Sequence, residues 1–168
     1  MSILTKDLFN LSMTLAKQIL DNCEYPWEAL PKIHDFILEL GPTLSIDEYT
    51  MPFENIWISK SAKIHNNTEI CGPAIIGHNT ELRTGAYIRG NVIIGDNCVI
   101  GNSCEIKNSI IFNKAQIPHF NYIGDSILGY KAHTGAGAIT SNVKSDKKLV
   151  IVKNGTQTIE TGLKKFGA

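Results

Sequence analysis

Side chains that could carry chemistry collect in one zone of the sequence, between residues 105 and 142. The zone places acidic, basic, amide and phenol groups among otherwise apolar repeats: Glu105, Lys107, His119, Asn121, Tyr122, Asp125, His133 and Asn142. An unperturbed histidine has a pKa of about 6.5, so it can act as a base near neutral pH, and a carboxylate can hold its ring. Arginine and lysine suit a phosphate monoester, while amide and phenol groups suit sugar hydroxyls. These residue types could move a proton and bind an anion or hydroxyl groups, although each could also be an ordinary solvated side chain.

A strict six-residue repeat must position these groups. Nine residues spaced by six are all Ile or Leu: Ile58, Ile64, Ile70, Ile76, Leu82, Ile88, Ile94, Ile100 and Ile106. The residues four further on are mostly small and never charged: Ala62, Thr68, Ala74, Thr80, Ala86, Val92, Cys98, Cys104 and Ile110. A helix repeats near 3.6 residues and an exposed strand near 2, so neither fits. The period indicates a parallel β-helix, in which three hexapeptides close one coil and each coil stabilises its neighbour. An ordinary Ile-rich sheet protein would not keep nine residues in phase.

The repeat slips after Ile106. The next inward aliphatic residue is Ile111, five residues on, and a second five-residue step separates Ile123 from Leu128. Continued to Thr134 and Thr140, the pattern gives roughly five coils over residues 58–143. Where a regular repeat breaks, a requirement other than packing can select the residues. The slipped zone is also the zone that holds the polar groups.

The segments on either side of the repeat predict other structure. Residues 1–54 lack the period and predict a small α-helical segment, ahead of a β-helix over residues 55–168. One helical face contains Leu8, Leu11, Leu15 and Ile19, with Thr5 as a cap, and the chain breaks at Tyr25-Pro26. A second face contains Ile33, Phe36, Ile37 and Leu40, begun near Pro31 and ended by Gly41-Pro42. Two short helices hold little core, so we expect them to dock on the β-helix or on a neighbouring subunit.

The last 25 residues leave the coil. Residues 144–148 predict a polar loop, and Asn154-Gly155 is a strong hairpin-turn signal within residues 149–158. Phe166-Gly167-Ala168 is read as the opening of another turn, without a polar cap. We therefore expect the natural polypeptide to be longer.

Composition narrows the class of protein. The 168 residues carry a formal net charge of zero, which argues against a phosphate-backbone footprint for nucleic acid. We expect no signal peptide, and no stretch approaches the roughly 20 apolar residues of a membrane span. The four cysteines contain no C-x-x-C pair, and Cys98 and Cys104 are predicted to be reduced core residues. These features favour a cytoplasmic protein.

Three motifs are more specific than the repeat. They are Glu105-Ile-Lys107, Pro118-His119-Phe-Asn121-Tyr122-Ile-Gly124-Asp125 and Gly135-Ala-Gly137-Ala-Ile-Thr140-Ser-Asn142. Together they resemble the acetyltransferase domain of the bifunctional bacterial glucosamine-1-phosphate N-acetyltransferase and N-acetylglucosamine-1-phosphate uridyltransferase. The chain is also similar to stand-alone hexapeptide proteins related to sugar-nucleotide pyrophosphorylases. The resemblance covers about residues 58–148 and implies a left-handed parallel β-helix, a homotrimer and active sites between subunits.

The resemblance also implies roles for individual residues. His119 matches the general base that takes a proton from the sugar amine as it attacks acetyl-CoA, and Glu105 matches the glutamate that supports it. The sugar phosphate would be held by Arg89, Lys107, Tyr122, Asn142 and Lys148, and Ala136 would contact acetyl-CoA. No metal is implied. Each residue has a plainer alternative: His119 an ordinary loop histidine, Glu105 and Lys107 a solvated pair, and Arg89 a surface charge.

The departures from this family are specific. No pyrophosphorylase domain precedes the repeat and the G-x-G-T-x-M type of nucleotide signature is absent, so we expect no uridyltransferase activity from this chain. His133 stands where the family usually has Asn, and Val143 stands where it has Tyr. The later coils that bind acetyl-CoA are missing. The acceptor side of the site is therefore better represented than the donor side.

Three functions follow as hypotheses. The first is acetyl-CoA-dependent N-acetylation of an amino-sugar phosphate such as glucosamine-1-phosphate. The second is a non-catalytic, trimeric sugar-phosphate-binding or assembly module that lacks the acyl-donor site. The third is a zinc hydratase with a histidine site across subunits, drawn from His65, His78, His119 and His133.

Overall fold

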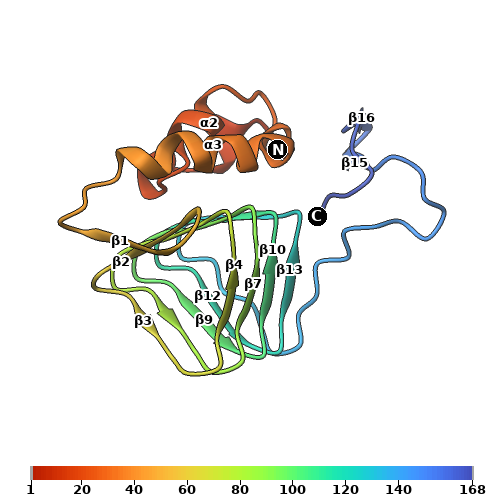
Figure 1. Cartoon of the computed structure of the whole chain (residues 1–168). Helices are drawn as coiled ribbons and strands as arrows, with labels where there is room; N and C mark the ends of the chain where they lie inside the picture. Colours follow the sequence, from red (N-terminus) through yellow and green to blue (C-terminus); the bar gives the residue numbers. More distant parts are fainter. Residues whose placement is uncertain (1, 168) are drawn as a thin grey trace.

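The computed structural model describes residues 2–167 and shows a three-sided parallel β-helix with a helical layer against one side (Figure 1). The first face is a sheet in the order β1-β2-β5-β8-β11-β14, the second β12-β9-β6-β3 and the third β13-β10-β7-β4. The first-face strands after β1 are β2 Ile56–Ser59, β5 Ala74–Ile76, β8 Val92–Ile94, β11 Ser109–Ile111 and β14 Ile127–Leu128. The second face holds β3 Lys63–Ile64, β6 Glu81–Leu82, β9 Val99–Asn102 and β12 Gln116–His119. The third holds β4 Glu69–Cys71, β7 Tyr87–Arg89, β10 Glu105–Lys107 and β13 Tyr122–Gly124. The predicted all-β, left-handed hexapeptide fold is confirmed.

The strand register confirms both slips in the repeat. Ile76 pairs with Ile94, 18 residues on, whereas Ile94 pairs with Ile111 and Ile111 with Leu128, each 17 residues on. Each shorter coil has one residue fewer at the corner between the third and first faces. The second coil turns this corner with two left-handed residues, Gly90 and Asn91, while later coils use Asn108 or Asp125 alone.

The interior is the predicted stack of aliphatic residues. The inward Ile and Leu side chains from Ile76 to Ile123 are buried, with Cys98 and Cys104 among them as free thiols. Burial raises the pKa of the Cys98 thiol to about 11, so the thiol is inert at neutral pH. Ile110 is the last of the residues predicted four positions after each repeat aliphatic, and its predicted place is wrong. It lies on the outer side of the first face, because the slip gives the small inward position to Ser109.

The helical layer covers the outer side of the first face. Its helices are α1 Thr5–Leu8, α2 Lys17–Asp21 and α3 Ile33–Leu40, and its 3-10 segments are η1 Leu11–Met13, η2 Pro26–Lys32 and η3 Gly41–Thr43. They share one buried cluster with the outward side chains of the sheet: Trp57, Ile75, Ile93, Ile110 and Phe112. Because β5, β8 and β11 are buried on both sides, their sequences are apolar at nearly every position. Docking on the β-helix is confirmed, while the division into residues 1–54 and 55–168 stays a prediction.

The prediction of one continuous helix with Leu8, Leu11, Leu15 and Ile19 on one face is wrong. The structure has three short segments there: α1, η1 and α2. Side chains of Asn10 and Thr14 accept hydrogen bonds from the backbone N–H groups of Ser12 and Ala16, and these local bonds divide the stretch into short pieces. Thr5 is not a cap, since its hydroxyl and its N–H both donate to the carbonyl of Glu24. The second helix is confirmed as α3, preceded by η2 from Pro26.

Antiparallel strand pairs lie before the first coil and after the last one. β1, Tyr49–Phe53, pairs with β2 although it lies within residues 1–54, for which the sequence predicts only a helical segment. The predicted hairpin is confirmed as β15 Ile151–Asn154 and β16 Gln157–Glu160. Residues 165–167 do not open another turn: Lys165 pairs antiparallel with Val143, and Phe166 and Gly167 donate to the carbonyls of Asn142 and Asp125. In residues 2–167 no helix is long and apolar enough to cross a membrane.

Candidate functional site

The third face presents two rows of outward side chains between its buried Ile residues. One row contains Tyr87, Glu105 and Tyr122, which are paired in register, and it lies nearer the second face. The other contains Arg89 and Lys107, which follow the paired Ile88 and Ile106 and so stand side by side. Two cations in neighbouring strands form a place for an anion.

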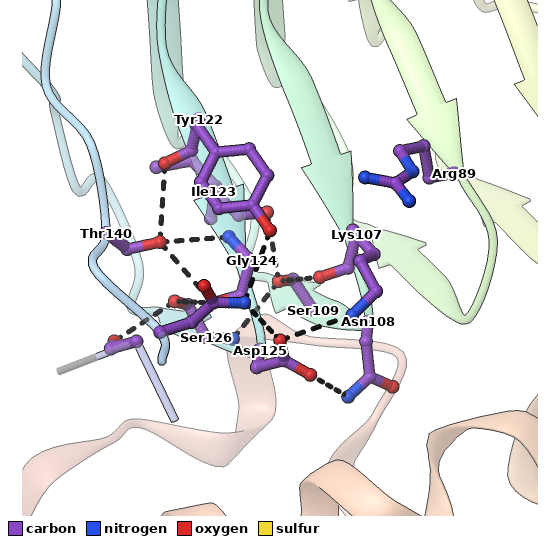
Figure 2. Close-up of polar contacts among 12 residues, drawn as sticks. Arg89, Lys107, Asn108, Ser109, Tyr122, Ile123, Gly124, Asp125, Ser126 and Thr140 are labelled. Carbon is purple, nitrogen blue, oxygen red and sulfur yellow. Dashed lines mark hydrogen bonds and ion pairs between the residues drawn. The ribbon is translucent and has the colours of Figure 1, made fainter. Parts of the chain in front are cut away.

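The second row ends at a buried carboxylate. Asp125 turns the corner after β13 and is only 3% exposed. Its Oδ1 accepts from Asn108 Nδ2 at 2.8 Å, and its Oδ2 accepts from Asn142 Nδ2 at 2.5 Å and lies 3.4 Å from Lys107 Nζ. Figure 2 shows Lys107 and Asn108 directed towards Asp125, with Arg89 to one side. Three of the predicted site residues, Lys107, Tyr122 and Asn142, therefore belong to one network.

Tyr122 joins this network by lying along its own strand. Its hydroxyl oxygen accepts from Asn142 Nδ2 at 3.2 Å. A Cβ on Gly124 would overlap this hydroxyl, so glycine at that position leaves the space in which the ring lies. Gly124 N–H in turn donates to Thr140 Oγ1 at 2.9 Å, which ties the strand to the last coil.

Arg89 is paired with Glu105. Arg89 Nη1 donates to Glu105 Oε1 at 2.6 Å, and both side chains are partly exposed. The hydrogen bond and the charge of this carboxylate raise the pKa of the Arg89 guanidinium above its ordinary value. Tyr87 is the aromatic neighbour of Arg89: the guanidinium carbon lies 6.0 Å from the centroid of its ring. Glu105 thus holds Arg89 in this structure, and its predicted role beside His119 stays a prediction.

His119 lies at the other corner of the same face. It ends β12, directly before the left-handed residue Phe120, and is exposed. In the part of the chain that the structure describes, its imidazole has no hydrogen bond or ion pair. Its backbone is fixed by the buried Asn121, whose Oδ1 accepts from His119 N at 3.1 Å and whose Nδ2 donates to Gly135 O at 2.7 Å. The base candidate is therefore an exposed ring on a backbone that Asn121 holds in place.

The other two predicted site residues lie beyond this coil. Ala136 is exposed in the turn whose Gly137 N–H donates to His119 O, so it is next to the base candidate. Lys148 is exposed in the loop after Asn142, where its N–H donates to Asp146 Oδ1 at 3.1 Å. The contacts of Lys148 do not connect it to Asp125 or His119.

Sequence reasoning assigns no role to three residues that organise the site: Asn108, Asn121 and Asp125. Asn121 and Asp125 stand inside the recognised motif, and Asp125 directly follows β13 at the second five-residue step. That coincidence of a charged residue with a shortened corner was the available signal. The contact of Asp125 with Asn108 depends on the 17-residue register, which only the structure supplies.

Two histidines of the zinc hypothesis have partners in the chain. His65 Nε2 lies 2.9 Å from Glu81 Oε1, and His78 Nδ1 lies 2.7 Å from Ser59 Oγ. Among the described residues no three His, Cys, Asp or Glu side chains are grouped as metal ligands would be.

Comparison with known proteins gives relatives of one kind. A protein of Methanococcus aeolicus named "Bifunctional protein GlmU" is 40% identical over 156 residues, covering 82% of this chain and 38% of that protein. A "Bifunctional sugar-1-phosphate nucleotidylyltransferase/acetyltransferase" of Sulfurisphaera tokodaii is 36% identical over 151 residues, covering 78% and 38%. One similar solved structure is a hexapeptide transferase family protein from Anaplasma phagocytophilum, with 22% identity, a TM-score of 0.23, and coverage of 49% of this chain and 67% of that one.

These relatives confirm the resemblance drawn from the motifs. The chain spans less than two fifths of the length of the two curated relatives. The family model described as "GMPPB C-terminal domain" matches residues 70–157, from β4 to the C-terminal hairpin. Because that match covers more than half of the chain, the chain belongs to the GMPPB C-terminal domain family.

Proposed function

We propose that this chain is an acyltransferase domain that uses acetyl-CoA to N-acetylate an amino-sugar phosphate such as glucosamine-1-phosphate. The single observation that carries the proposal is the position of Arg89 and Lys107 on neighbouring strands of the third face, with Tyr122 and Asn142 beside Lys107. The name of the Sulfurisphaera tokodaii relative, which includes an acetyltransferase, supports the reaction class. A homotrimer, a cytoplasmic location and a reaction without metal belong to the same proposal.

The phosphate would bind Arg89 and Lys107. Arg89 offers a fork of N–H groups and Lys107 a point charge, both of which suit phosphate oxygens. A phosphate dianion at Arg89 would compete with Glu105 for the guanidinium. Released from Arg89, the Glu105 carboxylate would be free to hold the imidazole of His119, as the family resemblance implies.

The chemical step needs one base. The neutral sugar amine attacks the thioester carbonyl carbon, the new C–N bond forms, and the C–S bond breaks to release the CoA thiolate. His119 would take the proton that the nitrogen loses and later pass it to the thiolate or to solvent. Ala136, in the turn next to His119, would face the acetyl group, and Lys148 would meet the sugar phosphate from its loop.

Thiol release from acetyl-CoA in the presence of glucosamine-1-phosphate tests the proposal. His119→Ala should lower turnover by about 10²–10⁴-fold, the usual contribution of a general base. His65→Ala is the matched control, because His65 is also exposed but follows β3 in the first coil and lies beside Glu81. Equal rates for the wild type and His119→Ala would remove His119 from the mechanism.

A binding module without transfer is the second candidate. It is favoured by the arrangement around His119, whose imidazole has no partner within residues 2–167 while Glu105 is bonded to Arg89. His133 and Val143 also depart from the family pattern. Calorimetry would distinguish the two functions: binding of glucosamine-1-phosphate together with no binding of acetyl-CoA favours the module, and binding of both favours the enzyme.

A further inference from the structure

Asp125 occupies a corner where the backbone alone would accept a neutral residue. Its N–H donates to Lys107 O at 2.9 Å and its φ is 50°, in the left-handed region. The equivalent corners of the two preceding coils use Asn91 and Asn108, with φ of 53° and 45°. Asparagine tolerates this conformation as well as aspartate does. The geometry of the turn therefore does not explain the carboxylate.

The carboxylate is buried and both of its oxygens have partners. Asn108 donates to Oδ1, and Asn142 and Lys107 approach Oδ2. A buried carboxylate is costly unless charged and polar partners compensate it. Asparagine could turn this corner without burying a charge. The presence of aspartate therefore points to a role in the neighbouring site.

The carboxylate decides which way Asn142 faces. An ionised carboxylate only accepts hydrogen bonds, so the Asn142 side chain must turn its NH₂ group towards Asp125. The same nitrogen also donates to the hydroxyl oxygen of Tyr122. Both N–H bonds of Asn142 are then used inside the network, and its carbonyl oxygen stays available as an acceptor. Since the Tyr122 oxygen already accepts, its own hydrogen stays available as a donor.

We propose that Asp125 is a positioning residue that sets the hydrogen-bonding polarity of the sugar-phosphate pocket. Through Asn142 it makes the pocket present a carbonyl acceptor to a hydroxyl or amine of the ligand. Through Tyr122 and Lys107 it makes the pocket present donors to the phosphate oxygens. The inference rests on the proposed function for its ligand, an amino-sugar phosphate, and it adds the reason why a phosphate and a neighbouring donor group are recognised together.

Asp125→Asn tests the proposal. The amide keeps the size and the left-handed turn, as Asn108 does one coil earlier, but it no longer forces Asn142 to donate. We expect glucosamine-1-phosphate to bind about ten- to a hundredfold more weakly in calorimetry, because one charge-assisted bond is worth about that factor. Acetyl-CoA affinity should stay unchanged. Asp96→Asn is the matched control: Asp96 also lies at a corner and accepts from a backbone N–H, that of His78, but it is not on the third face.

A swapped pair separates positioning from simple support of the fold. Asp125→Asn with Asn142→Asp restores an amide–carboxylate bond between the two positions but places the carboxylate next to the ligand. We expect the midpoint of thermal unfolding to recover and the affinity for glucosamine-1-phosphate not to recover. Recovery of the affinity in the swap would overturn the proposal, as would undiminished binding by Asp125→Asn.

The wild-type measurements keep this proposal distinct from the proposed function. Binding of glucosamine-1-phosphate without thiol release would reject the acyltransferase and leave the positioning role supported by the variant series. Thiol release that survives undiminished in Asp125→Asn, with unchanged KM for the sugar phosphate, would keep the enzyme and reject the positioning role. Absence of glucosamine-1-phosphate binding by the wild-type chain would overturn the positioning role as stated.

Discussion

The ring of Tyr122 lies over the backbone of Gly124, two residues further along β13. Outward side chains of a strand normally stand on alternate positions, so a side chain at position 124 would occupy the space that the phenol needs. The hydroxyl reaches Asn142 only because this space is empty. At the scale of single residues, the site therefore depends on a missing side chain as much as on Lys107 and Asn142.

Gly124→Ala should displace the Tyr122 ring from the network. Because the new methyl group overlaps the hydroxyl, either the ring rotates away or the strand shifts, at a cost of about 1–3 kcal/mol in unfolding free energy. We expect about tenfold weaker binding of glucosamine-1-phosphate by calorimetry. Gly135→Ala is the control, since a Cβ there meets nothing within 4 Å. Equal affinity in Gly124→Ala and wild type would show that the ring does not contribute to binding.

The corners are the elements that vary between coils. The third-to-first corner loses one residue after β10 and again after β13, and each shortened corner is turned by one left-handed residue. Those residues, Asn108 and Asp125, consequently stack and hydrogen-bond. The same register change moves Ile110 outward to the helical layer. One deletion per coil thus shapes both the polar site and the apolar cover.

Tyr49, in β1, carries a buried hydroxyl that has no hydrogen-bond partner among the described residues. An unsatisfied buried polar group costs about 1–3 kcal/mol, so Tyr49→Phe should raise the free energy of unfolding by about 1 kcal/mol. Burial, with the charges of Asp96 and Glu48, raises the pKa of Tyr49 to about 12 in the folded chain, above its ordinary value. The folded state therefore resists ionisation, and stability present below about pH 10 is lost as the pH rises towards about 12.

Urea unfolding at pH 8 and pH 11 measures both effects. The Phe variant should be more stable at pH 8 and should lose less stability than the wild type at pH 11, because it has no phenol to ionise. Tyr130→Phe, at a partly exposed ring, controls for alkaline effects elsewhere. A Phe variant less stable than the wild type at pH 8 would mean that the hydroxyl has a partner in solution.

Across the whole molecule, periodicity predicts what repeats and misses what occurs once. The spacing of six places the inward residues from Ile76 to Ile123 and both slips correctly, and the Asn154-Gly155 turn signal places the hairpin, because each follows from local pattern. β1 pairs with the next strand, β2, through an irregular register that breaks the pattern of alternation, and the docking of residues 165–167 depends on Val143, which is distant in sequence. The motif places Lys107, Tyr122 and Asn142 in one site, but the role of Asp125 appears only when the register brings Asn108 to it.

The three faces of the coil differ in what lies against them. Helices cover the first face (Figure 1), and the polar site occupies the third. Within the helical layer, α3 contacts β8, a central strand of the covered face. His34 Nδ1, 2.9 Å from Asn91 Oδ1, joins the same helix to the corner that leads from the third face. The helical layer is thus fixed to the coil by an apolar cluster and by a polar contact at its edge.

Ile93→Ala tests whether the helical layer can loosen without the site. Ile93 is buried on the outer side of β8, so the cavity should cost about 2–5 kcal/mol. If residues 1–54 form a separate unit, amide hydrogen exchange should accelerate in residues 17–40 while residues 87–124 stay protected, and glucosamine-1-phosphate should bind as before. Ile88→Ala, the same change on an inward side chain of the same region, should instead accelerate exchange throughout the coil. Uniform acceleration in Ile93→Ala would mean that layer and coil unfold as one domain, and the proposed boundary at residues 54 and 55 would then be wrong.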